Sequence, residues 1–465
     1  MPAAIPVVIV PPEQVPSSSP SSRWSPSPPL SPPSITAITV AGVAAGGVLA
    51  VLPYAHLTAL RNVILYAGLI ALALGWRHLS GQRRRDAMPM VSLLIAWASL
   101  GLLSLTWAVD RAYSASELQS EVLYAALVFA LFFFLADRVW LKRWFQVVVA
   151  TSLLSLLVVG WRFGVGDTGL AKFYNGPGLY STYLCVVYPI ALIGLLQPDQ
   201  SWRVRAALIG VRVVVAVGGW LTVNRTLWIV MGLQTLLVIV LAPGRGGPGG
   251  VRTALAVRAS IALAALALLA ATLYAVSASR FSIAPNTPNA SSAIAQTATS
   301  DIRGKIWPYA LKRIAERPWT GAGIGRGALR EDLRATFGSG LIWHAHNVVL
   351  NFGISLGVPG MILIVGIFIV VLAQFTRIWR NGPAWLRPYA LAAIVIVVGL
   401  IAKSMTDDFF YRQTTLIFWA LIGMIVGAAS RERAGLVSRE RAAFVPRERA
   451  VDTSQSAVTR AAVHG

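Results

Sequence analysis

Residues 346–372 read HNVVLNFGISLGVPGMILIVGIFIVVL, a stretch that contains no Asp, Glu, Lys or Arg. A membrane-spanning helix needs about 20 mostly apolar residues, so this stretch is long enough to cross a bilayer. We expect an all-α polytopic integral membrane protein with about 12 transmembrane helices. Eleven further apolar runs carry this prediction: 35–53, 57–76, 88–106, 118–136, 144–162, 178–196, 206–221, 226–242, 257–276, 387–403 and 413–429.

The composition of the 465 residues agrees with a membrane protein. Apolar residues make up 56% of the chain and charged residues only 12%, against about 25% charged residues in soluble domains. The mean hydropathy is +0.66. These values argue against a cytosolic enzyme, a disordered scaffold and a nucleic-acid-binding protein. The net charge of +22 fits cationic loops beside a bilayer, and the single Cys185 leaves no disulfide framework.

The region 206–242 could form one helix or two. As one helix it would extend about 55 Å, far beyond a hydrocarbon core of about 30 Å. Gly218, Gly219 and the polar residues 222–225 offer a place to reverse direction. Two spans also place 15 basic residues at the short loops of one face and seven at those of the other. This bias puts the N-terminus in the cytoplasm. The seven on the opposite face are Arg61, Arg111, Arg162, Lys172, Arg225, Lys403 and Arg412.

The same orientation divides the chain into five parts and puts both termini in the cytoplasm. The first part is rich in Pro and Ser and has the composition of a disordered tail. The one long loop lies on the outside, and long loops are usually functional. Within it, the spacing of Ile302, Ile306, Ala310 and Ile314 predicts a helix over 301–317, with Asp301 as its N-cap. The parts are 1–34 (tail), 35–276 (helices 1–9), 277–345 (loop), 346–429 (helices 10–12) and 430–465 (charged tail).

Basic residues on the outer face are candidates for anion binding. Arg225 lies at the tip of a tight hairpin, where it either reaches the lipid headgroups or binds an anion, since guanidinium matches phosphate oxygens. Arg162 and Lys172 are interfacial anchors or further anion ligands. Arg303 begins the helix of the long loop, with Trp307 on the same face. It is either an ordinary surface charge or a ligand.

Two histidines and two aspartates are candidates for proton transfer. His344 and His346 immediately precede an apolar helix and allow three interpretations. They are a metal pair lacking further ligands, polar residues of a helix start, or a site of general-base catalysis near neutral pH. Asp407 and Asp408 could orient a histidine, bind sugar hydroxyls or face water.

The run Gly321–Gly327 (GAGIGRG) permits tight turns or a close approach of the backbone to phosphate. No strand precedes it and the GxGxxG spacing is absent, so a dinucleotide site is not expected.

These motifs resemble the O-antigen ligase/polymerase family of bacterial envelope proteins. The resemblance rests on RGKIWPYALKRIAERPWTGAGIG (303–325), HAHN (344–347), NFGISLGVPG (351–360) and NRT (224–226). It implies a GT-C-like membrane fold and glycosyl transfer at the periplasmic face of the inner membrane. The donor in this family is a glycan on undecaprenyl diphosphate, and no cofactor or metal is used. Ligases transfer the glycan to lipid A–core with inversion, polymerases to another carrier-linked repeat, and other relatives to a protein hydroxyl.

The resemblance also implies roles for particular residues. Arg225 and Arg303 would bind the diphosphate, with Arg162 and Lys172 as weaker candidates. His346 would be the base. His344 or an aspartate would orient it, and Asp407, Asp408 and Trp307 are candidates for orienting or sugar contacts. The alternative from another class is a lipid or sugar transporter or flippase. Such folds often show internal repeats and ionisable residues near the midplane, whereas here the basic residues gather at one face.

Overall fold

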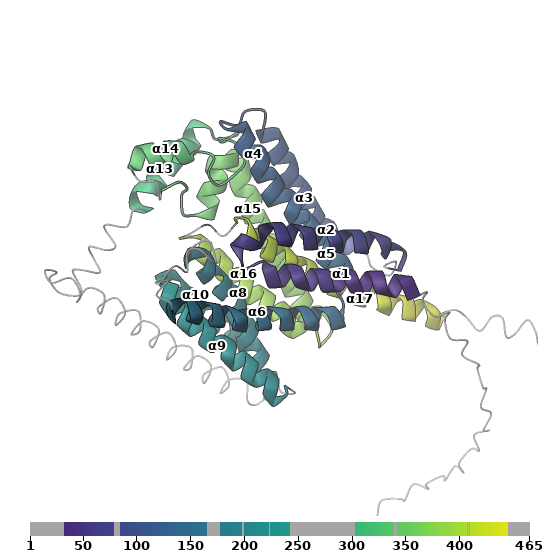
Figure 1. The fold of residues 1–465 in the computed structure, drawn as a ribbon. Coiled ribbons are helices and arrows are strands. Elements are labelled where there is room, and N and C mark those ends of the chain that lie inside the picture. Colours follow the sequence, from purple (N-terminus) through teal and green to yellow (C-terminus); the bar gives the residue numbers. More distant parts are fainter. Residues whose placement is uncertain are drawn as a thin grey trace, which may run out of the picture.

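The computed structural model describes residues 32–78, 84–164, 177–197, 200–222, 224–241, 303–338, 342–406, 408 and 410–444, and every element within these ranges is a helix (Figure 1). The N-terminal half contains α1 (Pro32–Val51), η1 (Ala55–Leu57), α2 (Thr58–Leu74), η2 (Trp76–His78), α3 (Arg84–Ser104), α4 (Arg111–Glu117), η3 (Leu118–Leu123), α5 (Tyr124–Leu135), α6 (Arg138–Gly164), α8 (Pro177–Leu195) and α9 (Trp202–Thr222). The C-terminal half contains α10 (Arg225–Leu241), α13 (Arg303–Glu316), α14 (Arg330–Phe337), α15 (Val348–Asn381), α16 (Arg387–Ser404) and α17 (Gln413–Phe444).

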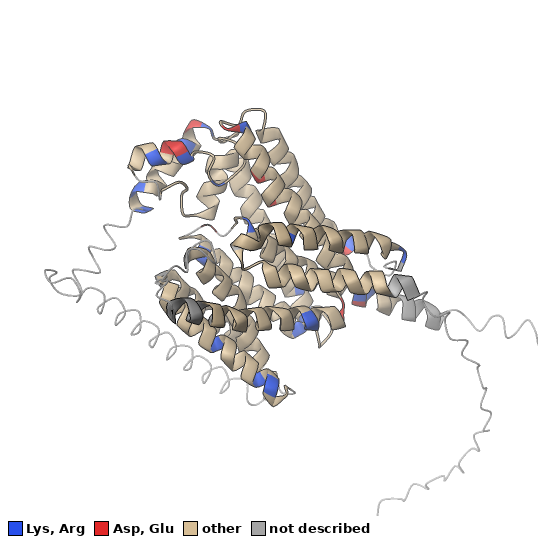
Figure 2. Ribbon diagram, in the orientation of Figure 1, with Lys and Arg blue, Asp and Glu red and all other residues tan. Residues whose placement is uncertain are grey.

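Seven helical segments in the described ranges are long and apolar enough to cross a membrane, and three shorter apolar helices accompany them. Eleven of the twelve expected runs overlap a helix, and the run 257–276 lies outside the described residues. The division of 206–242 into two helices is confirmed, because α9 ends at Thr222 and α10 begins at Arg225. The total of twelve spans stays a prediction. Figure 2 shows Lys, Arg, Asp and Glu gathered at the helix ends and on α13 and α14, while the middle of the bundle is almost free of them.

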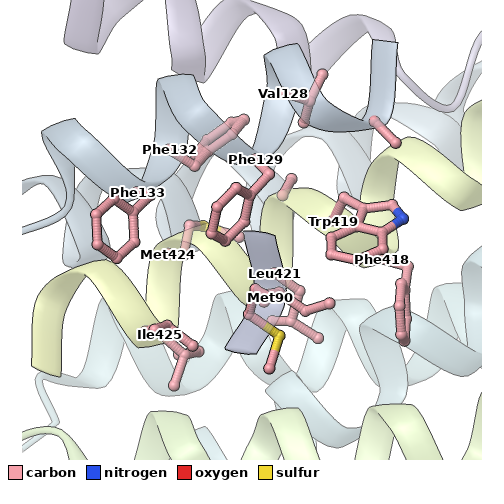
Figure 3. Close-up of a cluster of buried hydrophobic side chains, with 14 of the residues drawn as sticks. Met90, Val128, Phe129, Phe132, Phe133, Phe418, Trp419, Leu421, Met424 and Ile425 are labelled. Carbon is pink, nitrogen blue, oxygen red and sulfur yellow. The ribbon is translucent and has the colours of Figure 1, made fainter. Parts of the chain in front are cut away.

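The centre of the bundle is the contact between α5 and α17. Phe129 of α5 packs edge-to-face against Trp419 of α17 with ring centroids 6.1 Å apart, and Phe132 and Phe133 belong to the same buried cluster (Figure 3). Gly427 lets the two helices approach closely, because a Cβ there would overlap the Phe133 carbonyl oxygen. Small residues at helix contacts are the usual means of close packing in membranes.

Two helices differ from the sequence expectation. The run expected at 118–136 belongs to a longer rod, α4–η3–α5, that contains a π-helical stretch at Leu118–Leu123. The last helix continues to Phe444, so residues 430–444 of the expected charged tail are helical. Arg431 pairs with Asp137 at 3.2 Å in this extension, which ties it to the start of α6.

The long loop contributes a helical pair beside one end of the bundle. The helix expected over 301–317 is confirmed as α13 (303–316), and its buried face is Ile306, Ala310 and Ile314 as the spacing predicted. Asp301 and Ile302 lie outside the described residues. Arg313 of α13 pairs with Asp332 of α14 at 2.9 Å, which joins the two helices. In Figure 1 the pair lies next to the start of α15, where the candidate site is found.

Candidate functional site

The site centres on residues 344–347, which we call the histidine turn. His344 is buried, with 4% of its surface exposed, whereas His346 is half-buried. The His346 backbone has a φ of 51° and its N–H donates to His344 Nδ1 at 3.0 Å. A neutral His344 that accepts at Nδ1 carries its proton on Nε2. The two ring centroids lie 3.9 Å apart, with the ring planes tilted by 44°.

A buried amide and an indole hold the histidine turn in place. Asn351 accepts from the Ala345 N–H at 2.7 Å and donates to Asp408 Oδ2 at 2.7 Å. Trp307 of α13 donates from Nε1 to the Ala345 carbonyl oxygen at 3.1 Å. Ala345 thus has both backbone groups bonded by side chains, which fixes the direction of the residues on either side. Trp307 therefore contacts the turn itself, whereas the sequence placed it only on the same helix face as Arg303.

The loop between α16 and α17 joins three other elements to the turn. Arg303 Nε donates to the Thr406 carbonyl oxygen at 2.9 Å, and Asn347 Nδ2 donates to the Met405 carbonyl oxygen at 3.2 Å. The Thr406 hydroxyl lies 3.2 Å from the Thr226 hydroxyl in the first turn of α10. The starts of α10, α13 and α15 therefore meet at Met405 and Thr406.

The structure describes some of the predicted basic residues with their side chains, some by their backbone only, and one not at all. Arg303 is half-buried at this junction. Arg225 is the first residue of α10, next to Thr226, and its side chain lies outside the described features, as does that of Arg162 near the end of α6. Asn224 caps α10 by accepting from the Leu227 N–H at 3.3 Å. Lys172 and Asp407 lie outside the described residues.

Asp408 is buried, with 5% of its surface exposed, so the interpretation in which it faces water is wrong. Its Oδ1 accepts from the Phe410 N–H at 2.9 Å, and its Oδ2 accepts from Asn351. With Glu121, Arg326, Asn351 and Ser355 it lines a cavity of about 30 Å³. A polar cavity of that size can hold a water molecule. Asp408 therefore supports the histidine turn through Asn351.

The backbone of the glycine-rich run forms hydrogen bonds with α15 where that helix is interrupted. α15 is interrupted at Gly357, where φ is 70° and ψ is −163°. The carbonyl oxygens of Ile354 and Ser355 accept from the N–H groups of Ala322 and Gly323 at 2.8 and 2.9 Å. The Val358 N–H donates to Pro318 at 2.7 Å. The break is thus closed by backbone groups of the loop.

Other N–H groups of the run are also occupied. That of Ile324 donates to the Ser104 hydroxyl at 3.0 Å, and that of Gly327 to the Tyr113 hydroxyl at 2.8 Å. With Ala322 and Gly323, four N–H groups of the run have partners within the protein. The interpretation as a phosphate cradle is therefore wrong for these four groups, and the alternative of tight turns holds.

Arg326 is a site residue that the sequence reasoning missed. Its guanidinium carbon lies 4.3 Å from the ring centroid of Trp343 and 3.9 Å from that of Tyr411. Its Nη1 donates to the Asp408 carbonyl oxygen at 3.0 Å. Arg326 thereby links the glycine-rich run, the residue before the histidine turn and the α16–α17 loop. The sequence feature that could have pointed to this role is that Arg326 is the one charged residue in the glycine-rich run.

Burial raises the pKa of the Tyr411 hydroxyl above its ordinary value, an effect that the neighbouring guanidiniums of Arg412 and Arg326 oppose. The phenol is therefore neutral in the physiological range. Its ring stays an uncharged surface against which the Arg326 guanidinium packs.

Comparisons with known proteins agree with the motifs. Residues 201–365 match a family model described as O-Antigen ligase, a region that runs from α9 into α15 and includes Arg225, Arg303 and His346. The chain is also 27% identical over 347 residues to an O-antigen ligase of Pseudomonas aeruginosa strain PAO1, covering 72% of this chain and 75% of that protein. This chain is therefore similar, over most of its length, to members of the O-antigen ligase superfamily.

Proposed function

We propose that the protein is an O-antigen ligase of the bacterial inner membrane, active at the periplasmic face. It would move a glycan from undecaprenyl diphosphate to a sugar hydroxyl of lipid A–core, with inversion and without a metal ion. The observation that carries this proposal is the junction at Met405 and Thr406. There the first turns of the helices bearing Arg225 and Arg303 meet the histidine turn.

His346 is the proposed general base. A sugar hydroxyl is a poor nucleophile, and a neutral imidazole within hydrogen-bond reach accepts its proton as it attacks the anomeric carbon. The bond to His344 Nδ1 fixes the backbone of His346, and the two rings lie side by side with their centroids 3.9 Å apart. A single base on the acceptor side, opposite the leaving group, gives inversion by analogy with inverting glycoside chemistry.

Arg225 and Arg303 are the proposed diphosphate ligands. Departure of a lipid diphosphate develops negative charge, and each positioned donor is typically worth roughly 3–4 kcal/mol of barrier. The bond from Arg303 Nε to Thr406 orients one guanidinium at the junction. Arg162 and Lys172 are proposed as weaker contributors from the family resemblance.

The first experiment tests transfer and the base together. The purified full chain, in EDTA, receives undecaprenyl-diphosphate glycan and rough lipopolysaccharide, and the product is read as a gel mobility shift. We expect a shift that disappears in His346→Ala and persists in His56→Ala, a matched histidine control in η1. Near-wild-type transfer by His346→Ala would end the base assignment. Elongated carrier-linked chains in a reaction with donor alone would identify a polymerase. No product in either reaction would favour a protein acceptor or a transporter.

The diphosphate assignment has its own test. Arg225→Lys and Arg303→Lys keep the charge but lose the planar fork that matches phosphate oxygens. We expect both variants to lose most transfer activity, whereas Arg334→Lys, on the exposed face of α14, keeps it. Full activity of either of the first two variants would contradict its role.

A further inference from the structure

A carboxylate is buried in the rod α4–η3–α5, within a segment that is long and apolar enough to cross a membrane. Glu121 has 5% of its surface exposed and belongs to the π-helical stretch Leu118–Leu123. An ionisable residue inside a membrane-spanning segment is a candidate for function whose partner has to be named. Single π-helical turns within α-helices are also frequent at functional sites. Both features mark Glu121 as a candidate.

Glu121 binds the start of the last helix. Its Oε1 accepts from the Arg412 N–H at 2.8 Å, and its Oε2 accepts from the Thr415 hydroxyl at 3.0 Å. Thr415 lies in the first turn of α17 and is fully buried. The two carboxylate oxygens therefore hold the chain at the point where the α16–α17 loop enters α17.

The Arg412 backbone needs such support. Its φ of 47° lies in the left-handed region, which residues other than glycine rarely adopt. A residue in that region persists only where the surrounding contacts fix it, and such residues gather at functional sites. In the part of the chain that the structure describes, one other non-glycine residue has a positive φ. It is His346, the proposed base, with a φ of 51°.

A series of contacts leads from the histidine turn to Glu121. The Ala345 N–H donates to Asn351, and Asn351 donates to Asp408, both at 2.7 Å. Asp408 lies four residues before Arg412 in the α16–α17 loop. Asp408 and Glu121 also line the same cavity. The loop is thus held by Asn351 at Asp408 and by Glu121 at Arg412.

We propose that Glu121 is a positioning residue for the histidine turn, acting through the α16–α17 loop. The carboxylate fixes Arg412, and Arg412 fixes the loop from which Asp408 binds Asn351. This role rests on the proposed function, because the histidine turn carries the proposed base. It requires hydrogen bonds and not a negative charge, since the two partners are a backbone N–H and a hydroxyl. A glutamine can bind both, by accepting from the N–H and donating to the hydroxyl.

Three variants of the purified full chain test this role. Glu121→Leu removes both acceptors, and we expect kcat for glycan transfer to fall about 100-fold, the effect of displacing a catalytic group by about 1 Å. The KM for the lipid-linked donor should stay close to wild type. Glu121→Gln should keep most of the wild-type kcat. Thr415→Val removes one of the two hydrogen bonds and should lower kcat about fivefold.

Asp137→Leu is the matched control, because Asp137 also binds α17 but at the opposite end. Its Oδ2 accepts from Arg431 at 3.2 Å and its Oδ1 accepts from the Trp140 N–H at 2.8 Å. Its kcat should stay near wild type, and melting curves show which variants are folded. An equal fall in kcat in Asp137→Leu, or a wild-type kcat in a folded Glu121→Leu, would overturn the proposal. A Glu121→Gln variant as slow as Glu121→Leu would also overturn it, because the effect would then belong to the charge.

Hydrogen–deuterium exchange separates this role from the proposed function. Peptides that cover the histidine turn and the α16–α17 loop should exchange faster in Glu121→Leu and at the wild-type rate in Asp137→Leu. If Glu121→Leu does not fold, Thr415→Val is compared with wild type in the same way. Unchanged exchange at the histidine turn in the folded variant would overturn the positioning role. Absence of transfer by wild-type protein, together with faster exchange in the variant, would count against the ligase function alone.

Discussion

Replacing Asn351 by leucine should disable the histidine turn while leaving the bundle assembled. Asn351 is 2% exposed and bonds the Ala345 N–H and Asp408, both at 2.7 Å. Losing the acceptor leaves the fully buried Ala345 N–H unsatisfied, which costs about 1–3 kcal/mol. Losing the donor removes a bond to a charged carboxylate, worth about 1.5–3 kcal/mol. The two losses together cost about 2.5–6 kcal/mol, and they fall on the contacts that hold the histidine turn in position.

The expected consequence is kinetic. Displacement of a catalytic group by about 1 Å lowers the rate roughly 100-fold, so kcat for glycan transfer should fall by that factor while the KM for the lipid-linked donor stays close to wild type. Gln374→Leu is the control, because it removes another buried amide of α15 far from the turn. Melting curves check that both variants are folded. A kcat for Asn351→Leu equal to that of the control would refute the reasoning.

Asn351→Asp extends the test to pH. The new carboxylate can still accept from Ala345, but it faces Asp408 at the distance of the lost hydrogen bond. Two carboxylates this close cannot both ionise without strong repulsion. They share a proton at low pH and repel each other as the pH rises. Transfer by this variant should therefore decline with increasing pH relative to wild type, and a parallel pH profile would contradict the assignment.

Three further substitutions test other parts of the site. Arg326→Lys removes the planar group between two aromatic rings, and we expect a clear fall in kcat, with little change in melting temperature, in the transfer assay. Trp307→Phe deletes one hydrogen bond to the histidine turn, worth about 1 kcal/mol, so a fall of about fivefold in kcat is expected from steady-state kinetics. Gly357→Ala places a Cβ against the Pro318 carbonyl oxygen at a φ of 70°, and thermal unfolding should show a loss of stability.

Much of the fold follows from local patterns in the sequence. Long apolar runs predicted the helices, and the spacing of Ile306, Ala310 and Ile314 predicted the buried face of α13. The polar residues around Arg225 predicted the break between α9 and α10. Each of these features depends on residues close together in the chain, which is why a sequence can reveal them.

The missed features depend on partners distant in the chain. The break in α15 is closed by backbone groups more than 30 residues earlier, and backbone atoms leave no mark on residue type apart from glycine. The π-helical stretch that directs Glu121 toward Arg412 joins residues 291 positions apart. The Arg326 guanidinium is held between two aromatic rings that belong to separate loops. Sequence spacing alone does not reveal contacts between residues that are distant in the chain.

The broken helix also bears on how the chain is made. Within a bilayer, open backbone carbonyls cost several kcal/mol each, so an interrupted helix such as α15 is a hazard during insertion. Its partners, Pro318, Ala322 and Gly323, precede it in the chain and are therefore synthesised first. When Ile354 and Ser355 emerge from the ribosome, the N–H groups that donate to their carbonyl oxygens are already synthesised. The chain segment that bonds the open backbone groups of α15 is thus translated before α15 itself. A circular permutant in which this order is reversed should insert into the membrane less efficiently than the natural chain.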